Sequence, residues 1–204
     1  MNSLHIMAGS LVVLGCFYTG SWAFFKTHSV DFIAAQHQAH AEQRRRAPAS
    51  CTLDTLLNFT SDAAAATQKY QVQGWSHPET WGTWTDGAVA ELAMRLTPAP
   101  SGPLRLMTRI QSAMTHRQQP IQEIEILAND TIIGHAFFRA GDPPLDLNSL
   151  IPATALNNEG MLRLVFRIAH PSSPKALGMS EDPRQLGILV HQIRISAVAV
   201  DAPS

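Results

Sequence analysis

Hydrophobic and polar residues alternate along most of the chain after residue 50, and this two-residue period is that of β-strands with one buried face. Strands are predicted at residues 88–96, 104–111, 123–127, 131–138, 162–168 and 189–195, with shorter ones at 53–59 and 70–75. Ala128-Asn129-Asp130 predicts a tight hairpin turn, residues 145–156 are expected to hold a short helical turn, and apolar residues on both faces of 189–195 indicate a strand covered on both sides. Because no helices alternate with the strands, the pattern favours an all-β, antiparallel β-sandwich of jelly-roll (galactose-binding-like) type.

A different pattern precedes the sandwich. Residues 6–25 contain no Asp, Glu, Lys, Arg or His. A helix of roughly 20 such residues is about 30 Å long, which matches the hydrocarbon thickness of a bilayer. The segment is therefore predicted to be a single N-terminal transmembrane helix.

Two other interpretations of this segment stay open. Ser21-Trp22-Ala23 resembles the cleavage site of a signal peptide, and Val13-Leu14-Gly15-Cys16 approximates a lipoprotein signal. An uncleaved anchor is favoured over both, because residues 1–5 hold no Lys or Arg and the apolar run continues past each processing point.

The segment after the anchor is predicted to be a helical spacer with a linker. Lys26 and Arg44-Arg45-Arg46 follow the membrane run, and taken alone the positive-inside rule would place the sandwich in the cytoplasm. The predicted organisation is an N-terminal tail at 1–5, the anchor at 6–25, the spacer and linker at 26–50, and the sandwich at 51–204.

Composition narrows the functional classes. The chain is 15% charged with a formal net charge of -1, and the part from Cys51 onward holds 11 Lys+Arg against 14 Asp+Glu. A mildly acidic sandwich does not bind nucleic acid by bulk electrostatics, so no nucleic-acid partner is predicted. Two cysteines exclude a disulfide scaffold.

Three of the four tryptophans lie within ten positions and form the first candidate ligand site. Trp75, Trp81 and Trp84 are interspersed with Glu79 and Asp86. An aromatic ring covers the apolar face of a sugar and a carboxylate accepts hydrogen bonds from its hydroxyls, so this composition suits glycan binding. In the alternative interpretation, the rings close one end of the sandwich while Glu79 pairs with an arginine or caps backbone amides.

The second candidate cluster contains Asp182 and Arg184, which either grip a ligand or pair with one another and cap a turn; pairing is favoured. Motifs of catalysis are missing, since Gly178-Met179-Ser180-Glu181 lacks the second glycine of a nucleophile elbow and no zinc or phosphate motif is present. No catalytic residue, metal or cofactor is predicted. A glycosidase pair built from Glu79 with Asp86 or Glu91 stays open as an alternative.

The motifs around these clusters resemble a bacterial β-sandwich domain of unknown function, which occurs appended to glycosyltransferases and other membrane proteins of cell-surface and exopolysaccharide pathways. The matching residues are Gly74-Trp75-Ser76, Pro78-Glu79, Trp81-Gly82-Thr83-Trp84, Gly87, Ala128-Asn129-Asp130, Ile133-Gly134, Leu162 to Ile168, Ser173-Pro174, Leu177-Gly178, Ser180, Asp182, Arg184 and Leu186-Gly187. Asp130 stands where that family usually has glycine. The resemblance implies a sandwich in a bacterial, polysaccharide-related envelope setting, and it brings no established activity.

This setting favours a periplasmic sandwich on the inner membrane, against the charge rule. The leading hypothesis is a non-catalytic, membrane-anchored envelope protein whose sandwich binds a bacterial polysaccharide or docks a polysaccharide-synthesis or export complex. The first alternative is a structural subunit that stabilises a membrane glycosyltransferase by protein contacts. The second is a carbohydrate-active enzyme that uses Glu79 and nearby acids.

Overall fold

A computed structural model describes residues 48–198 except 113, 116–119 and 158. The predicted anchor at 6–25 and the predicted spacer up to residue 47 lie outside the described residues. Within the described part, no helix is both long and apolar enough to cross a membrane.

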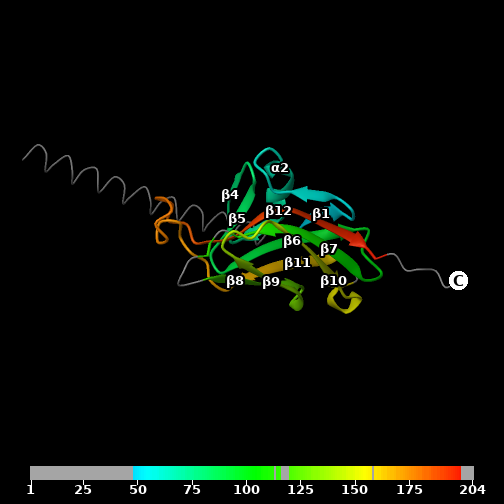
Figure 1. Cartoon of the computed structure of the whole chain (residues 1–204). Helices are drawn as coiled ribbons and strands as arrows, with labels where there is room; N and C mark the ends of the chain where they lie inside the picture. The colour runs from blue at the N-terminus through cyan, green and yellow to red at the C-terminus, as the bar shows by residue number, and fades with distance from the viewer. Residues whose placement is uncertain (1–47, 113, 116–119, 158, 199–204) are drawn as a thin grey trace, which may run out of the picture. The chain divides into compact units, whose positions relative to one another are not determined.

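The described residues form a β-sandwich of two six-stranded sheets (Figure 1). Sheet A has the order β1-β6-β11-β8-β9, with β3 also paired to β6; its strands are β1 (Ala49–Thr52), β3 (Gln71–Gln73), β6 (Val89–Thr97), β8 (Ile121–Ala128), β9 (Thr131–Arg139) and β11 (Met161–Ile168). Sheet B has the order β10-β7-β12-β5-β4, with β2 paired to β12; its strands are β2 (Leu56–Asn58), β4 (Trp75–Glu79), β5 (Gly82–Asp86), β7 (Leu104–Gln111), β10 (Leu145–Ile151) and β12 (Leu186–Ala197). Short helices lie at α2 (Ala64–Thr67), η1 (Gln68–Tyr70) and η2 (Ala153–Ala155).

The core lies between the two sheets and follows from the alternation in the sequence. Along β6 the residues Ala90, Leu92 and Met94 are fully buried, and along β7 the inward Leu104 and Leu106 are buried while their neighbours are exposed. Burying such side chains contributes about 25 cal/mol per Å² of apolar surface, so each long strand is anchored by one face.

Most predicted strands are confirmed, as is the hairpin between β8 and β9. Its turn residues Asn129 and Asp130 both have positive φ, 44° and 69°, which is the backbone that a two-residue hairpin turn requires. The Asn129 side chain adds to this turn by accepting a hydrogen bond from the Arg163 amide, so it also joins the β8–β9 turn to β11.

Three features differ from the sequence prediction. The short helical turn predicted within 145–156 is confirmed as η2, but residues 145–151, for which no strand was predicted, form β10, which pairs with β7 over its whole length. The pairing of β1 with β6 is parallel, whereas every other ladder in the described part is antiparallel. The tryptophan-rich segment forms the β4–β5 hairpin, which strand alternation did not predict because a bulge shifts its register.

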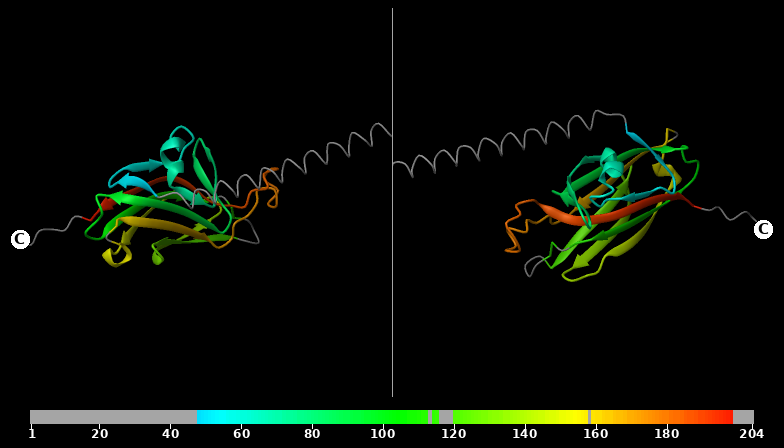
Figure 2. Two further views of the ribbon diagram at one scale, coloured as in Figure 1. Left: turned by 180° about the vertical axis from the view of Figure 1, so that it is seen from behind. Right: turned by 90° about the horizontal axis from the view of Figure 1, so that it is seen from above.

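The segment between β11 and β12 projects from one end of the sandwich, opposite the end where β12 finishes (Figure 2, orange). It contains the predicted cluster of Asp182 and Arg184. Its position brings this cluster against the β4–β5 hairpin, more than 90 residues earlier in the sequence.

Candidate functional site

Trp75 belongs to the core. Its side chain is 5% exposed, its ring stacks on Phe59 with centroids 5.5 Å apart, and Phe166 meets it edge-on at 6.0 Å. Its indole Nε1 donates a 2.8 Å hydrogen bond to the Glu91 carbonyl oxygen. Because its ring is enclosed by protein, Trp75 presents no face to a sugar. The prediction that Trp75 binds a ligand is therefore wrong, and the residue packs in the core.

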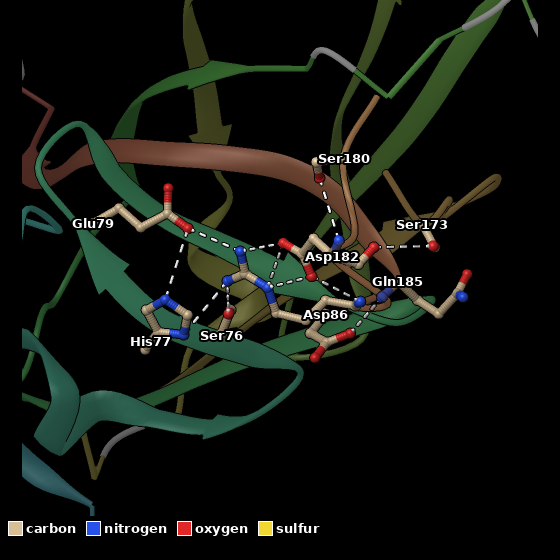
Figure 3. A network of polar contacts seen from close by, with 9 residues as sticks. Ser76, His77, Glu79, Asp86, Ser173, Ser180, Asp182 and Gln185 are labelled. Carbon is tan, nitrogen blue, oxygen red and sulfur yellow. Dashed lines mark hydrogen bonds and ion pairs between the residues drawn. The ribbon is translucent and has the colours of Figure 1, made fainter. Parts of the chain in front are cut away.

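Glu79, Asp182 and Arg184 come together in a network that we call the Arg184 clamp, which also includes Ser76 and His77 (Figure 3). The Arg184 Nε donates to both Asp182 oxygens at 3.0 and 2.9 Å, and Nη2 donates to Asp182 Oδ2 at 2.5 Å and to Glu79 Oε1 at 3.1 Å. Its Nη1 donates to the Ser76 hydroxyl and lies 3.5 Å from His77 Nδ1.

The loop before β12 is folded so that it presents Arg184 to the hairpin. Asp182 Oδ1 accepts a hydrogen bond from the Arg184 amide at 3.0 Å, a local bond by which aspartate commonly fixes turns. Asp86, at the end of β5, accepts the Gln185 amide at 2.9 Å. Asp86 is thus a further anchor of the loop.

Arg184 and Asp182 stabilise each other's charged forms in the Arg184 clamp. The hydrogen bonds from Arg184 hold the pKa of Asp182 below its ordinary value, and the same bonds raise the pKa of Arg184. Every guanidinium nitrogen already has a protein partner, and the side chains of Arg184 and Asp182 are each only 23% exposed. The clamp therefore holds the loop to the sandwich and has no free donor for a ligand.

The other two tryptophans lie at the surface. Trp81, at the β4–β5 turn, is 71% exposed. Gly82 follows it with φ of 152°, and a Cβ there would lie 2.4 Å from the Val190 carbonyl oxygen, so only glycine lets the turn approach β12 this closely. Trp84 is half-buried and pairs across the sheet with Leu189, which is not part of the core cluster.

A groove of about 240 Å³, which was not predicted from the sequence, lies on the outer face of sheet B. It is lined by Leu56, Met107, Thr108, Arg109, Asp146, Leu147, Asn148, Gln192 and Arg194, from β2, β7, β10 and β12. The polar positions of the alternating strands could have indicated this surface. Arg109 and Arg194 occupy outward positions, which a two-layer sandwich leaves open to solvent.

Strand register places the groove and Trp84 on the same face. One row across the sheet contains Asp146, Arg109 and Gln192, and the next contains Asn148, Met107 and Arg194. Beyond the bulge in β12, Leu189 pairs with Gln111 on one side and with Trp84 on the other. We call this surface the sheet B face.

His191 lies at the bulge and links the groove to the tryptophan turn. Its Nδ1 is 2.6 Å from the Trp81 carbonyl oxygen. Because a carbonyl only accepts, Nδ1 carries the proton of the neutral ring. Burial, and then the charge of Arg109, hold the pKa of His191 below its ordinary value of 6.5. Its Nε2 is buried and has no hydrogen-bond partner in the structure as described.

Among the described residues, no three or more His, Cys, Asp or Glu side chains are grouped to hold a metal ion. Two of the predicted acids are in the Arg184 clamp and a third caps the loop. Of the predicted ligand residues in the described part, Trp81 is exposed, and Trp84, Glu79 and Asp86 are half-buried, but Glu79 and Asp86 each hold the loop before β12.

No protein-family model and no curated protein matches this sequence. Similar solved structures include the CBM36-1 domain of a multidomain xylanase from the hindgut metagenome of Trinervitermes trinervoides, at 10% identity over 72% of this chain and 98% of that one, with a TM-score of 0.37. The C-terminal CBM6 of LamC from Zobellia galactanivorans is similar at 11% identity over 70% and 100% of the two chains, with a TM-score of 0.37. Dimeric latent PorU from Porphyromonas gingivalis is similar at 11% identity over 69% of this chain and 12% of that one, with a TM-score of 0.42. Similarity at this level gives no basis for transferring a ligand.

Proposed function

We propose that this chain is a non-catalytic glycan-binding protein whose binding site is the sheet B face. The observation that carries the proposal is the groove together with the surface tryptophans beside it. Its walls present amide, guanidinium and carboxylate groups, from Asn148, Gln192, Arg109 and Asp146. Such planar polar groups hydrogen-bond to sugar hydroxyls, and an indole covers the apolar face of a pyranose.

The dimensions suit an oligosaccharide better than a single sugar. Leu189, beside Trp84, and Gln192, beside the groove, are three residues apart on β12. At roughly 3.3 Å per residue this is about 10 Å along the strand. A chain that lies along β12 would contact both ends of the sheet B face, with the His191 bulge between them.

The positions of the acids oppose a glycosidase. Glu79 pairs with Gly82, and Asp86 lies four residues further along the same strand, so their backbones are roughly 13 Å apart, and their carboxylates bind different groups, Arg184 and the Gln185 amide. Carboxyl pairs that hydrolyse glycosides are about 5 to 10 Å apart. Glu79 and Asp182 are closer to one another, but Arg184 lies between them and keeps Asp182 ionised, which removes it as a proton donor.

The direct test is calorimetric titration of the full chain with a panel of bacterial polysaccharides. We expect binding that Trp84→Ala weakens by about tenfold, because stacking on one indole contributes on the order of 1 kcal/mol or more. Phe137→Ala is the matched control, since Phe137 is an exposed aromatic of sheet A, 54% exposed on β9. Absence of binding to every member of the panel, or equal loss in both variants, would contradict the proposal.

In this proposal the sandwich is held at a bacterial inner membrane by residues 6–25 and lies in the periplasm. The uncharged length of that segment supports an anchor. Lys26 and the arginines at 44–46 favour the opposite orientation. Reporter fusions after residue 204, one active only in the cytoplasm and one active only outside it, test the two orientations directly.

A second function, docking of a polysaccharide-synthesis or glycosyltransferase complex, is favoured by one observation. The edge strand β9 exposes Phe137 and Ile132, which are 54% and 49% exposed. Apolar side chains on an open strand edge are typical of protein contacts. Crosslinking and co-purification from native membranes test this function: Phe137→Asp should release a bound partner, and a chain that purifies alone in both forms would count against it.

A further inference from the structure

Positive charge gathers on the sheet B face although the sandwich as a whole is acidic. The outward positions of β7 and β12 hold Arg105, Arg109 and Arg194. Among the described outward positions of β7, β10 and β12, Asp146 is the one acid. From Cys51 onward the chain has 11 basic and 14 acidic residues, so the charge of this face is opposite in sign to the net charge of that part of the chain.

The three arginines differ in their partners. Arg109 is neutralised by Asp146, with Nη1 at 2.8 Å from Oδ2. Arg105 and Arg194 make no hydrogen bond or ion pair within the described part of the chain. As far as the described residues go, two of the three guanidinium groups are therefore available to an anion.

The two free arginines are also close to one another. Arg194 pairs with Met107, while Arg105, two residues before it on β7, pairs with Ser196. Diagonal neighbours of this kind are about 7 to 8 Å apart across a sheet. Arg194 itself lines the groove, beside the amides of Asn148 and Gln192.

We infer that the glycan bound on the sheet B face is acidic, with carboxylate groups that pair with Arg194, in the lining of the groove, and with Arg105, one row further along β7, while the groove holds a sugar ring. This inference rests on the proposed glycan-binding function. Guanidinium groups form charge-assisted, often bidentate hydrogen bonds to carboxylates, which favours a uronate over its neutral analogue. A concave groove with amide walls and a carboxylate in its lining fits a polysaccharide better than the flat surface of an anionic membrane.

The experiment compares acidic oligosaccharides with their own neutral forms. Oligogalacturonate, oligomannuronate and oligoglucuronate, each as the free acid and as the methyl ester, are titrated into the full chain by calorimetry at low and at physiological salt. At least one free acid should bind about tenfold or more tightly than its ester, and salt should narrow the difference because it screens exposed charges.

Variants assign this preference to the two arginines. Arg194→Gln and Arg105→Gln should each reduce binding of the free acid by about tenfold and reduce binding of the ester much less. Arg95→Gln is the matched control, because Arg95 is exposed on β6 of sheet A and makes no hydrogen bond or ion pair within the described residues. It should bind acid and ester as the unchanged chain does.

Four results would overturn the inference, and they are distinguishable. Equal binding of acid and ester, still sensitive to Trp84→Ala, leaves a glycan site with no acidic preference. Equally tight binding of polyphosphate or of anionic phosphatidylglycerol vesicles, reduced by Arg194→Gln, shows a general anion or lipid surface instead. If no uronate binds but another polysaccharide does, the acidic inference fails alone; if nothing binds, the proposed function fails as well.

Discussion

Arg184 and Arg194 lie ten residues apart in the sequence but in different surroundings. Arg184, in the loop before β12, donates from every nitrogen to a protein partner and joins a projecting loop to the β4–β5 hairpin. Arg194, in β12 itself, lies beside a groove and has no partner in the described part of the chain. A guanidinium whose donors are all used stabilises the fold, whereas one left free beside a concave polar surface is available to a ligand.

The tryptophans show the same division within one hairpin. Trp75 is enclosed by Phe59 and Phe166, while Trp81 and Trp84 lie outside the core. Strand geometry explains the difference, because side chains alternate between the two faces of β4 and β5 and only one face meets sheet A. Their clustering in the sequence therefore does not mark a single aromatic site.

The largest effect is expected from the buried tryptophan. Trp75→Ala should lower the free energy of unfolding by about 3 to 5 kcal/mol, because it removes a large aromatic side chain from a packed core. Urea denaturation of the full chain, followed by intrinsic fluorescence, measures it. Trp81→Ala, at a position 71% exposed, should change the same quantity by less than about 0.5 kcal/mol. Equal losses in the two variants would refute the division between core and surface tryptophans.

A smaller effect is expected from opening the Arg184 clamp. Arg184→Gln should lower the free energy of unfolding by roughly 2 kcal/mol, since Asp182 and Glu79 lose a charged donor in a partly buried place. Arg184→Lys should restore little of the lost stability, because an ammonium group does not reproduce the planar fork that reaches four side chains. Denaturation midpoints and protease sensitivity of residues 173–185 report the change.

The same variants also separate the clamp from the groove. Glycan affinity of Arg184→Gln should stay close to that of the unchanged chain wherever the protein remains folded, because the clamp has no free donor to lose. A folded, stable Arg184→Gln chain that no longer binds glycan would instead make the clamp the binding site.

Alternation along the strands was enough to predict the sandwich and most of its long strands. The β4–β5 hairpin was not predicted, because a bulge breaks the two-residue period and Pro78 interrupts the apolar pattern. The strand at residues 145–151 was not predicted for a related reason: Asp146, Asn148 and Ser149 weaken the strand pattern locally, and pairing along the full length of β7 overrides it.

The candidate site was only partly predictable. The pairing of Asp182 with Arg184, close in sequence, and the alternative in which Glu79 meets an arginine both agree with the Arg184 clamp. The groove was not predictable, because it needs the order β10-β7-β12 with β2 alongside, and sequence periodicity specifies faces without specifying neighbours. Several motifs that carry the family resemblance, Ser76, Glu79, Asp182 and Arg184, hold the loop in place, whereas the open groove lies outside them.

The smallest change in the free energy of unfolding is expected when the pH is lowered. This change also separates the Arg184 clamp from the sheet B face most sharply. His191, beside the groove, and Asp182, in the clamp, both have a pKa below the ordinary value, the first chiefly because of burial and the second because of hydrogen bonds from Arg184. The unfolded chain therefore takes up each proton before the folded chain does, so stability is lost as pH falls. The loss of stability caused by protonation of His191 should begin near pH 6.5, and the loss caused by protonation of Asp182 should begin near pH 3.8.

Urea midpoints measured from pH 8 to pH 3 test these two steps with one variant each. His191→Gln should flatten the decline between about pH 7 and 5 and leave the acid step, and Asp182→Asn should do the reverse, because each removes one titrating group from one region. Two variants with the same pH profile as the unchanged chain would show that neither group titrates differently on unfolding. A flattened upper step accompanied by loss of glycan binding below pH 6 would tie the neutral form of His191, bonded to Trp81, to the shape of the sheet B face.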